Sequence, residues 1–281
     1  MGLLQAWGDA AQVSGRLTPP DGLVHAPPGG RGGTVVAMCG RFVASTPVSV
    51  LAEQFLAAEI RAGEQAARFN VAPSDQVPAI ATSGGIRRLG TLSWGLVPSW
   101  ATSGSSGRRM VNLRSETLAE RPGFRRTLQR RRCIVPADGF YEWQHGGTGG
   151  PRQPYLIRAR DRAPLAMAGL WDVWVDREDP AGERLRTCTV LTTSPNAVVA
   201  ALHDRMPVIL PADVWDVWLD PEVTDVDLLT GLLRPCPGDL LELVPVGTAV
   251  NNVRNDGPSI VDRVEPIARM IPFGGEEPPM R

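Results

Sequence analysis

The stretch Gln76-Val-Pro-Ala-Ile-Ala-Thr-Ser-Gly-Gly-Ile-Arg-Arg-Leu-Gly-Thr-Leu-Ser-Trp94 decides the fold class of this 281-residue chain. Two largely apolar runs, 76–82 and 86–94, flank the turn residues Ser83-Gly84-Gly85. A Gly-Gly pair between such runs is typical of an antiparallel β-hairpin, because glycine readily adopts the positive φ angles that tight hairpin turns require. The sequence therefore predicts a hairpin here, embedded in antiparallel sheet.

Other segments repeat this short apolar pattern, and a few show the 3.6-residue period of amphipathic helices. We expect further strands at 110–112, 134–135, 139–144, 155–158, 165–174, 187–193 and 241–246. We expect helices at 47–62, after Ser115, from about 124, from Asn196 towards His203, at 212–219 and at 223–233. Many short strands mixed with peripheral helices predict an α+β fold: a single domain with a β-rich, antiparallel, barrel-like core.

The two ends of the chain lack these patterns. Residues 1–37 are rich in Pro and Gly and have no amphipathic period, so we expect a disordered leader or a translation start at Met38. The domain is expected to cover 38–262, followed by a flexible tail over 263–281. The sequence shows neither a secretory signal nor an apolar run long enough to span a bilayer, so we expect a cytoplasmic protein without a membrane partner.

The charges are unevenly distributed in a chain that has no lysine. Residues 87–132 contain eleven arginines and two acidic residues, whereas residues 172–242 contain five arginines and fourteen acidic residues. Because the net charge is only −1, this asymmetry predicts a basic face for an anionic partner on an otherwise acidic protein. The alternative is a general compositional preference for arginine.

Cys39 follows a methionine that resembles a start of translation. If Met38 is the start and is removed, Cys39 carries an α-amine of pKa about 7.7–8.0 and a thiol of pKa about 8.5 on adjacent carbons. This pair suits an aldehyde, since the amine can form an imine and the thiol can then close a five-membered thiazolidine. Cys133, Cys188 and Cys236 show neither a CxxC pair nor zinc-site spacing. We therefore expect no metal or other cofactor, and we interpret Cys133 and Cys188 as inert core residues.

Three short stretches hold the other polar candidates. Asn112 and Arg114 occupy alternating positions that share one face of a strand, although they could be plain surface residues. Glu142 lies between Tyr141 and Trp143, where aromatic neighbours would favour a general acid/base, unless it points to solvent. His203 could move protons near neutral pH, or it could be a structural histidine.

Tryptophans lie in or beside the arginine-rich half of the chain. Single-stranded nucleic acid is commonly held in a basic groove with aromatic platforms for its bases. Trp94, Trp100 and Trp143 are candidates for such platforms, and the alternative is that they fill the core. The sequence shows no helix-turn-helix, zinc finger or basic zipper for duplex recognition.

Six motifs together resemble the SRAP (SOS-response-associated peptidase) family in order and spacing, over about residues 38–260. They are Met38-Cys39-Gly40-Arg41-Phe42, Asn70-Val71-Ala72-Pro73, Trp94-Gly95, Asn112-Leu113-Arg114-Ser115-Glu116, Pro136-Ala137-Asp138-Gly139-Phe140-Tyr141-Glu142-Trp143 and His203-Asp204-Arg205-Met206-Pro207. The resemblance implies a sensor of abasic sites in single-stranded DNA, which forms a covalent thiazolidine crosslink through its N-terminal cysteine and shields the lesion in the DNA-damage (SOS) response.

The resemblance also implies roles for individual residues. The catalytic set is Cys39, Asn112, Glu142 and His203. DNA contacts are implied for Arg41, Asn70, Trp94, Arg114 and Arg205, to which the aromatic argument adds Trp100 and Trp143. The family name refers to a proposed self-cleavage that exposes the cysteine, so we expect peptidase-like self-processing with Schiff-base, lyase-like and largely single-turnover chemistry on abasic DNA.

The expected partner is single-stranded DNA that contains abasic sites, bound by a monomer at the nucleoid. Two alternatives stay open. A hydrolase with an N-terminal cysteine nucleophile would use Cys39, Glu142 and His203 on amide bonds with repeated turnover. A non-covalent single-strand-binding module would bind in a salt-sensitive way and would be indifferent to the lesion.

Overall fold

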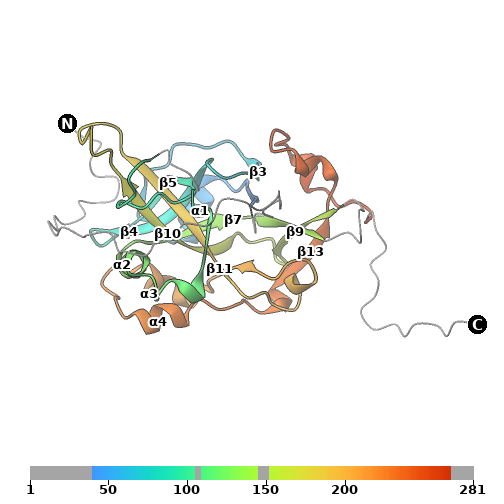
Figure 1. The fold of residues 1–281 in the computed structure, drawn as a ribbon. Coiled ribbons are helices and arrows are strands. Elements are labelled where there is room, and N and C mark those ends of the chain that lie inside the picture. Colours follow the sequence, from blue (N-terminus) through green and yellow to red (C-terminus); the bar gives the residue numbers. More distant parts are fainter. Residues whose placement is uncertain (1–39, 105–108, 145–151, 267–281) are drawn as a thin grey trace, which may run out of the picture.

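The computed structural model describes residues 40–104, 109–144 and 152–266, whose strands form two β-sheets with short helices at the periphery (Figure 1). The strands are β1 (Phe42–Ala44), β2 (Glu59–Ile60), β3 (Arg68–Val71), β4 (Gln76–Ser83), β5 (Ile86–Trp94), β6 (Asn112–Arg114), β7 (Arg132–Ala137), β8 (Gly139–Gln144), β9 (Gln153–Ala159), β10 (Leu165–Trp174), β11 (Leu185–Thr193), β12 (Met206–Pro207) and β13 (Leu241–Pro245). The helices are α1 (Val48–Gln54), α2 (Pro122–Arg130), α3 (Trp215–Leu219) and α4 (Val226–Gly231).

The larger sheet closes on itself into a five-stranded barrel. Its strand order is β12-β11-β10-β7-β4-β5-β2, and β11 also pairs with β5, which joins the two sides of the path β11-β10-β7-β4-β5. The closing pairs are Thr187 with Ser93 and Cys188 with Trp94, and they are parallel. The predicted barrel-like, β-rich single domain is confirmed, whereas the pairings of β5 with β11, β6 with β11 and β2 with β5 are parallel rather than antiparallel.

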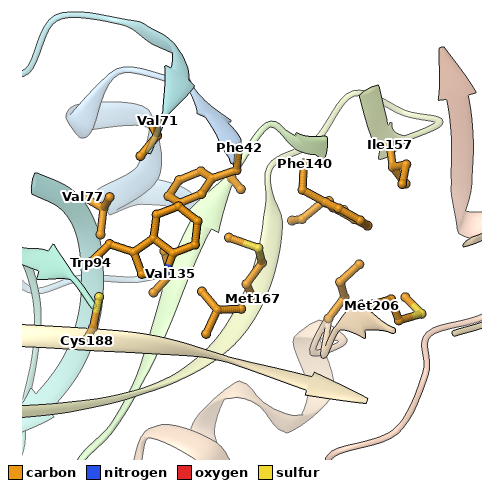
Figure 2. Close-up of a cluster of buried hydrophobic side chains, with 14 of the residues drawn as sticks. Phe42, Val71, Val77, Trp94, Val135, Phe140, Ile157, Met167, Cys188 and Met206 are labelled. Atoms are coloured by element: carbon orange, nitrogen blue, oxygen red, sulfur yellow. The ribbon is translucent and has the colours of Figure 1, made fainter. Parts of the chain in front are cut away.

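The second sheet has the order β13-β9-β8-β1-β3, and all its pairings are antiparallel. One buried cluster joins it to the barrel. Figure 2 shows Phe42 of β1 and Phe140 of β8 in the same cluster as Trp94, Val135 and Met167 from the barrel. Burial of this shared apolar surface orients the two sheets relative to each other.

The hairpin prediction is confirmed almost to the residue. β4 and β5 pair antiparallel from Gln76 with Ser93 to Ser83 with Ile86. Gly84 and Gly85 at the turn have φ angles of 57° and 72°, a conformation that costs glycine little because it has no Cβ atom. The strand predicted at 165–174 is also found with these bounds as β10.

Three helix predictions need correction, and one of them is the helix expected from Asn196 towards His203, where only the 3₁₀ turn Val199–Ala201 forms. The helix expected at 47–62 ends at Gln54, since Leu56 has a positive φ of 53° and the chain then pairs with β5 through β2. The Ala58 N–H donates to the carbonyl oxygen of Arg87 at 2.9 Å. The backbone from Ala58 onwards therefore hydrogen-bonds to the edge of β5 instead of continuing the helix. After Ser115 there is only a single 3₁₀ turn, and the helix expected from about 124 begins at Pro122 as α2.

Parts of the predicted domain organisation lie outside the described residues, namely 1–39 and 267–281. Beyond the expected boundary at 262, Arg263 forms a β-bridge with Val246, and the Val264 N–H donates to Pro245. Among the described helices, the longest has nine residues, and none is long and apolar enough to cross a membrane.

Candidate active site

The register of β1 against β8 aligns the start of the described chain with Glu142. Phe42 pairs with Phe140 and Val43 with Gly139, and the Tyr141 N–H donates to the carbonyl oxygen of Arg41 at 3.0 Å. Continuing this antiparallel count puts Gly40 opposite Glu142. Cys39 lies outside the described residues, but its peptide bond keeps its Cα about 3.8 Å from that of Gly40. Cys39 therefore directly precedes the residue that this register sets opposite Glu142.

Glu142 is buried, with 2% of its surface exposed. Its neighbour Tyr141 is also buried and donates its hydroxyl hydrogen to the Phe69 carbonyl at 2.8 Å. The alternative that placed Glu142 on the solvent face is therefore wrong. Burial of a carboxyl group is costly without hydrogen bonds or an ionic partner. The buried position of Glu142 therefore indicates polar surroundings inside the protein rather than a place on its surface.

Asp138 is a residue of this region to which the sequence analysis assigned no role. Its carboxylate accepts hydrogen bonds from Ser45 N at 2.5 Å, Ser45 Oγ at 2.8 Å and Thr46 N at 3.0 Å, and it also binds the Thr46 hydroxyl. These bonds tie the end of β1 to the β7–β8 connection and help to hold the register with β8. Its place in the 136–143 motif was the only available signal, because its partners are about 90 residues away in sequence.

The other catalytic candidates gather at the C-terminal end of β11. β6 pairs in parallel with β11, with Asn112 opposite Val190 and Arg114 opposite Thr192. β12 pairs with the other edge of β11 at Thr192 and Thr193, which brings the preceding residues 203–205 to the same end. The Arg205 Nη2 donates to the Thr192 carbonyl oxygen at 2.7 Å. The structure thus collects residues separated by about 90 positions around one strand end.

His203 lies at the edge of an open hollow of about 500 Å³, which Pro195, Ala200 and Asp204 also line. Its side chain is 8% exposed. Nδ1 accepts the Arg205 N–H at 3.0 Å, which in the neutral imidazole leaves the hydrogen on Nε2. If the ring gains a proton at Nδ1, the Asp204 carboxylate, 2.9 Å away, is a ready partner. His203 therefore borders the hollow with its Nδ1 already engaged by the Arg205 N–H.

Trp94 connects these two groups of residues from within the core. Its indole Nε1 donates to the Val111 carbonyl at 3.0 Å, directly before Asn112. Its ring contacts Phe42 edge-on at a centroid distance of 4.9 Å (Figure 2). Because Trp94 is only 1% exposed, it cannot offer a base-stacking surface in this structure, and its predicted place along the DNA path is corrected to a core position that links β1 with β6.

Three of the other predicted DNA-binding residues contact the segment 250–256 near the end of the described chain. Arg41 Nη1 donates to the Val250 carbonyl, and its guanidinium lies 4.8 Å from the ring centroid of Trp143. Burial lowers the pKa of Arg41. Trp143 Nε1 donates to Asn251 Oδ1 at 2.7 Å. Asn70 is completely buried and binds carbonyl oxygens of this segment, so its geometry is that of a structural clamp.

The remaining predicted DNA-binding residues are more accessible. Trp100 is 46% exposed and packs edge-on against Phe124 at 6.2 Å. Arg114 is exposed at the end of β6. Arg205 instead forms a bidentate pair with Glu116, at 2.8 and 2.7 Å, and its hydrogen bonds lower the pKa of Glu116. Trp100 and Arg114 can thus contact a ligand directly, whereas Arg205 is largely committed to Glu116 and Thr192.

The three described cysteines behave as core residues. Cys133, Cys188 and Cys236 are free thiols and are buried. Burial raises the pKa of Cys188 to about 12 and of Cys236 to about 11, and it also raises the pKa of Cys133. The interpretation of Cys133 and Cys188 as core residues is confirmed, and their raised pKa disfavours the thiolate, which is the reactive form. In the described part of the chain, no three His, Cys, Asp or Glu side chains form a group that could hold a metal ion.

Comparison with known families decides the classification. The model of the family described as SOS response associated peptidase (SRAP) matches residues 38–253. The chain belongs to the SRAP family. The matched range includes Cys39, Asn112, Glu142 and His203, which are the four predicted catalytic residues, and most of the 250–256 segment.

Relatives of this SRAP chain cover most of its length. The abasic site processing protein YoqW of Bacillus subtilis is 40% identical over 226 residues, which cover 80% of this chain and 99% of that protein. The abasic site processing protein HMCES of Gallus gallus is 32% identical over 238 residues, which cover 73% of this chain and 69% of that protein. A crystal structure of a protein from Bacteroides thetaiotaomicron matches with a TM-score of 0.70 at 26% identity, covering 81% of this chain and all of that one.

Proposed function

We propose that this chain processes abasic sites in DNA by capturing them covalently through Cys39, once that residue is the N-terminus. The observation that supports the proposal is the β1–β8 register. Continued by two residues before Phe42, it sets Gly40, the residue after Cys39, opposite the buried Glu142, and a carboxyl group is suited to proton transfer. The relatives YoqW and HMCES are named abasic site processing proteins, which supports the same substrate.

The chemistry follows from a 1,2-aminothiol and an aldehyde. The ring-opened deoxyribose presents its C1 aldehyde, and the Cys39 amine adds to that carbon to give a carbinolamine. Loss of one water molecule gives an imine. The Cys39 sulfur then adds to the imine carbon while the nitrogen takes up a proton, which closes a thiazolidine. The overall balance is the loss of one water, and removal of the imine also removes the intermediate that would lead to β-elimination and strand breakage.

The surrounding side chains supply proton transfer and orientation. Glu142 serves as the acid and base for the carbinolamine and imine steps, because it is buried opposite Gly40. His203 acts near the sugar oxygen, where its Nε2–H can assist ring opening, since its Nδ1 is engaged by the Arg205 N–H. Asn112 holds the Cys39 main chain or sulfur. Arg114 and Trp100, which are both exposed, bind a phosphate and stack on a base of single-stranded DNA.

The proposal requires a free amine on Cys39. In the full sequence the amine is part of a peptide bond, so the residues up to Met38 must be absent or removed. We propose that the protein acts as a monomer at the nucleoid and that any residues before Cys39 are lost by methionine removal or by self-cleavage. A comparison of chains expressed from Met1 and from Met38, by intact mass, distinguishes these routes.

The decisive experiment mixes the chain expressed from Met38 with single-stranded DNA that carries one abasic site. A heat-stable adduct is expected on a denaturing gel, with the protein lacking Met38 and the adduct mass equal to the sum of the partners minus one water. If no adduct forms although mass spectrometry confirms a free N-terminal Cys39, the covalent proposal is wrong.

Replacement of Cys39 by Ala separates the amine from the thiol. The Cys39→Ala chain keeps a reactive amine but cannot close the thiazolidine, so we expect weak lyase-like strand cleavage and no heat-stable adduct without a reducing agent. Borohydride trapping of the imine is the control that shows the amine still reacts. A full yield of stable adduct from this variant would rule out the role of the thiol.

A further inference from the structure

The segment 250–256 is an ordered loop that projects after β13 and lies beyond β3 and β9 in Figure 1. It begins in a 3₁₀ turn, Thr248–Asn251, and its residues 251–256 are all exposed. Exposed loops of this kind owe their shape to specific anchors, because they bury little apolar surface of their own. Here the anchors come from residues that flank the reaction site.

The first anchor is the fully buried Asn70 of β3. Its Nδ2 lies 3.2 Å from the Val250 carbonyl oxygen, 3.1 Å from that of Asn252 and 2.9 Å from that of Asn255. A carboxamide has two N–H donors, so the three carbonyls share them. A single buried side chain therefore fixes the backbone of the loop at three points.

The other anchors lie next to the reactive positions. Arg41, two residues after Cys39, donates to the Val250 carbonyl. Trp143, directly after Glu142, donates to Asn251 Oδ1 at 2.7 Å. The loop is thus held by the neighbours of both the proposed nucleophile and the proposed acid/base.

The tip of the loop presents two side chains whose chemistry suits DNA. Val253 is an apolar side chain that is 51% exposed. Arg254 is exposed and forms no ion pair with any residue in the described ranges. Its backbone N–H donates to Asn252 Oδ1 at 3.1 Å, so the turn that carries it is ordered. Arginine binds phosphate through charge and hydrogen bonds, and an exposed apolar side chain can contact an unstacked base.

We propose that the 250–256 loop is a DNA-contacting element of this SRAP chain, in which Arg254 binds a backbone phosphate beside the abasic nucleotide and Val253 packs against an adjacent base. The occupant is the single strand that carries the lesion. This inference rests on the proposed function for its ligand, but it concerns residues outside the catalytic set. It also gives Arg41, Asn70 and Trp143 a role in building the loop.

The test measures non-covalent binding to a single-stranded oligonucleotide with one tetrahydrofuran abasic analogue, which has no aldehyde and cannot be crosslinked. Arg254→Gln should weaken binding and make the slope of log K against log salt about 0.7 units shallower, because one phosphate contact is lost. Val253→Ser should weaken binding about fivefold, as expected if roughly half of a valine side chain is buried in the complex, with no change of the salt slope.

Arg177→Gln is the matched control. Arg177 is also exposed and forms no ion pair within the described residues, but it lies between β10 and β11, at the opposite end of β11 from His203. The full chain and the form that begins at Cys39 are tested in parallel, and thermal unfolding confirms that each variant is folded. Equal effects of Arg254→Gln and Arg177→Gln would indicate general electrostatics and overturn the proposal.

The covalent assay keeps this test independent of the proposed function. If the unmodified protein forms the adduct but Arg254→Gln binds the analogue with an unchanged salt slope, the loop proposal is wrong and the capture chemistry stands. If the unmodified protein with free Cys39 forms no adduct, the capture chemistry is wrong. An effect of Arg254→Gln on the salt slope would then still establish the loop as a single-strand contact.

Discussion

Replacement of Asn70 by Ala tests whether this residue is a clamp or a ligand contact. In the structure its Oδ1 is buried and accepts no hydrogen bond from the described residues, so only the Nδ2 contacts count. Two N–H donors at about 1 kcal/mol of net stability each predict a loss of about 2 kcal/mol. The Val250 carbonyl keeps its bond from Arg41, and the carbonyls of Asn252 and Asn255 are in part-buried positions where water can replace the lost donor.

Urea unfolding and thermal unfolding measure this loss. A change of about 2 kcal/mol corresponds to a fall in the unfolding temperature of about 4–8 °C for a domain of this size. Because the lost bonds all belong to the 250–256 loop, we also expect faster tryptic cleavage after Arg254, identified by mass spectrometry. Asn70→Asp should destabilise the protein more than Asn70→Ala, since a carboxylate would face three carbonyl oxygens without a hydrogen to donate.

Binding of the tetrahydrofuran oligonucleotide completes this prediction. If Asn70 acts through the loop, the effects of Asn70→Ala and Arg254→Gln on binding are not additive, because both remove the same contact. A variant Asn70→Ala that lost DNA binding while its stability changed by less than about 0.5 kcal/mol and its tryptic cleavage stayed the same would refute the clamp. Asn70 would then be a direct contact.

Two further substitutions probe the strands that carry the site. Gly139→Ala should destabilise the protein by about 1–3 kcal/mol and slow adduct formation, because the new Cβ would lie 2.8 Å from the Ile157 carbonyl oxygen. Gly247→Ala is the control, since its Cβ would meet no atom within 4 Å. Equal effects of the two substitutions would contradict the steric argument. Glu116→Gln should lower stability near neutral pH, because hydrogen bonds from Arg205 depress the pKa of Glu116 below its ordinary 4.5. That stabilisation is present above pH 4.5 and is lost as the pH falls through the lower folded-state pKa of Glu116. The free energies of unfolding of the unmodified protein and Glu116→Gln, measured in urea, should therefore converge in acid. A difference in the free energy of unfolding that does not depend on pH would argue against the ion pair as the source of the stabilisation.

Local patterns in the sequence determined much of the secondary structure. The Gly84-Gly85 turn and its flanking strands were predictable because a positive φ angle at two successive positions is a property of glycine itself. The motifs from Cys39 to His203 were sufficient to indicate the family, since each is a contiguous run of residues. The inert character of Cys133 and Cys188 followed from their β-branched neighbours.

Predictions failed where a local sequence pattern favoured one structure but a contact with residues distant in the sequence was more stable. The helical period after Pro47 was real, but the free edge of β5 paired with the chain at Glu59 and Ile60. Trp94 lies in an arginine-rich part of the sequence, yet its indole found a hydrogen-bond acceptor inside the core at Val111. Burial with a satisfied N–H is more favourable for tryptophan than exposure, and no property of the neighbouring sequence reveals it.

The sequence by itself therefore determined the chemical groups of this protein: an aminothiol position, a carboxyl group between aromatics, a histidine and an excess of arginine over one stretch. Only the tertiary structure decided which of them meet. The parallel closure of β5 on β11, the β1–β8 register opposite Glu142 and the Asn70 contacts with a loop 180 or more residues away all join distant segments. Such contacts depend on the packing of two complete sheets, and a local pattern of side chains carries no information about which distant backbone will complete them.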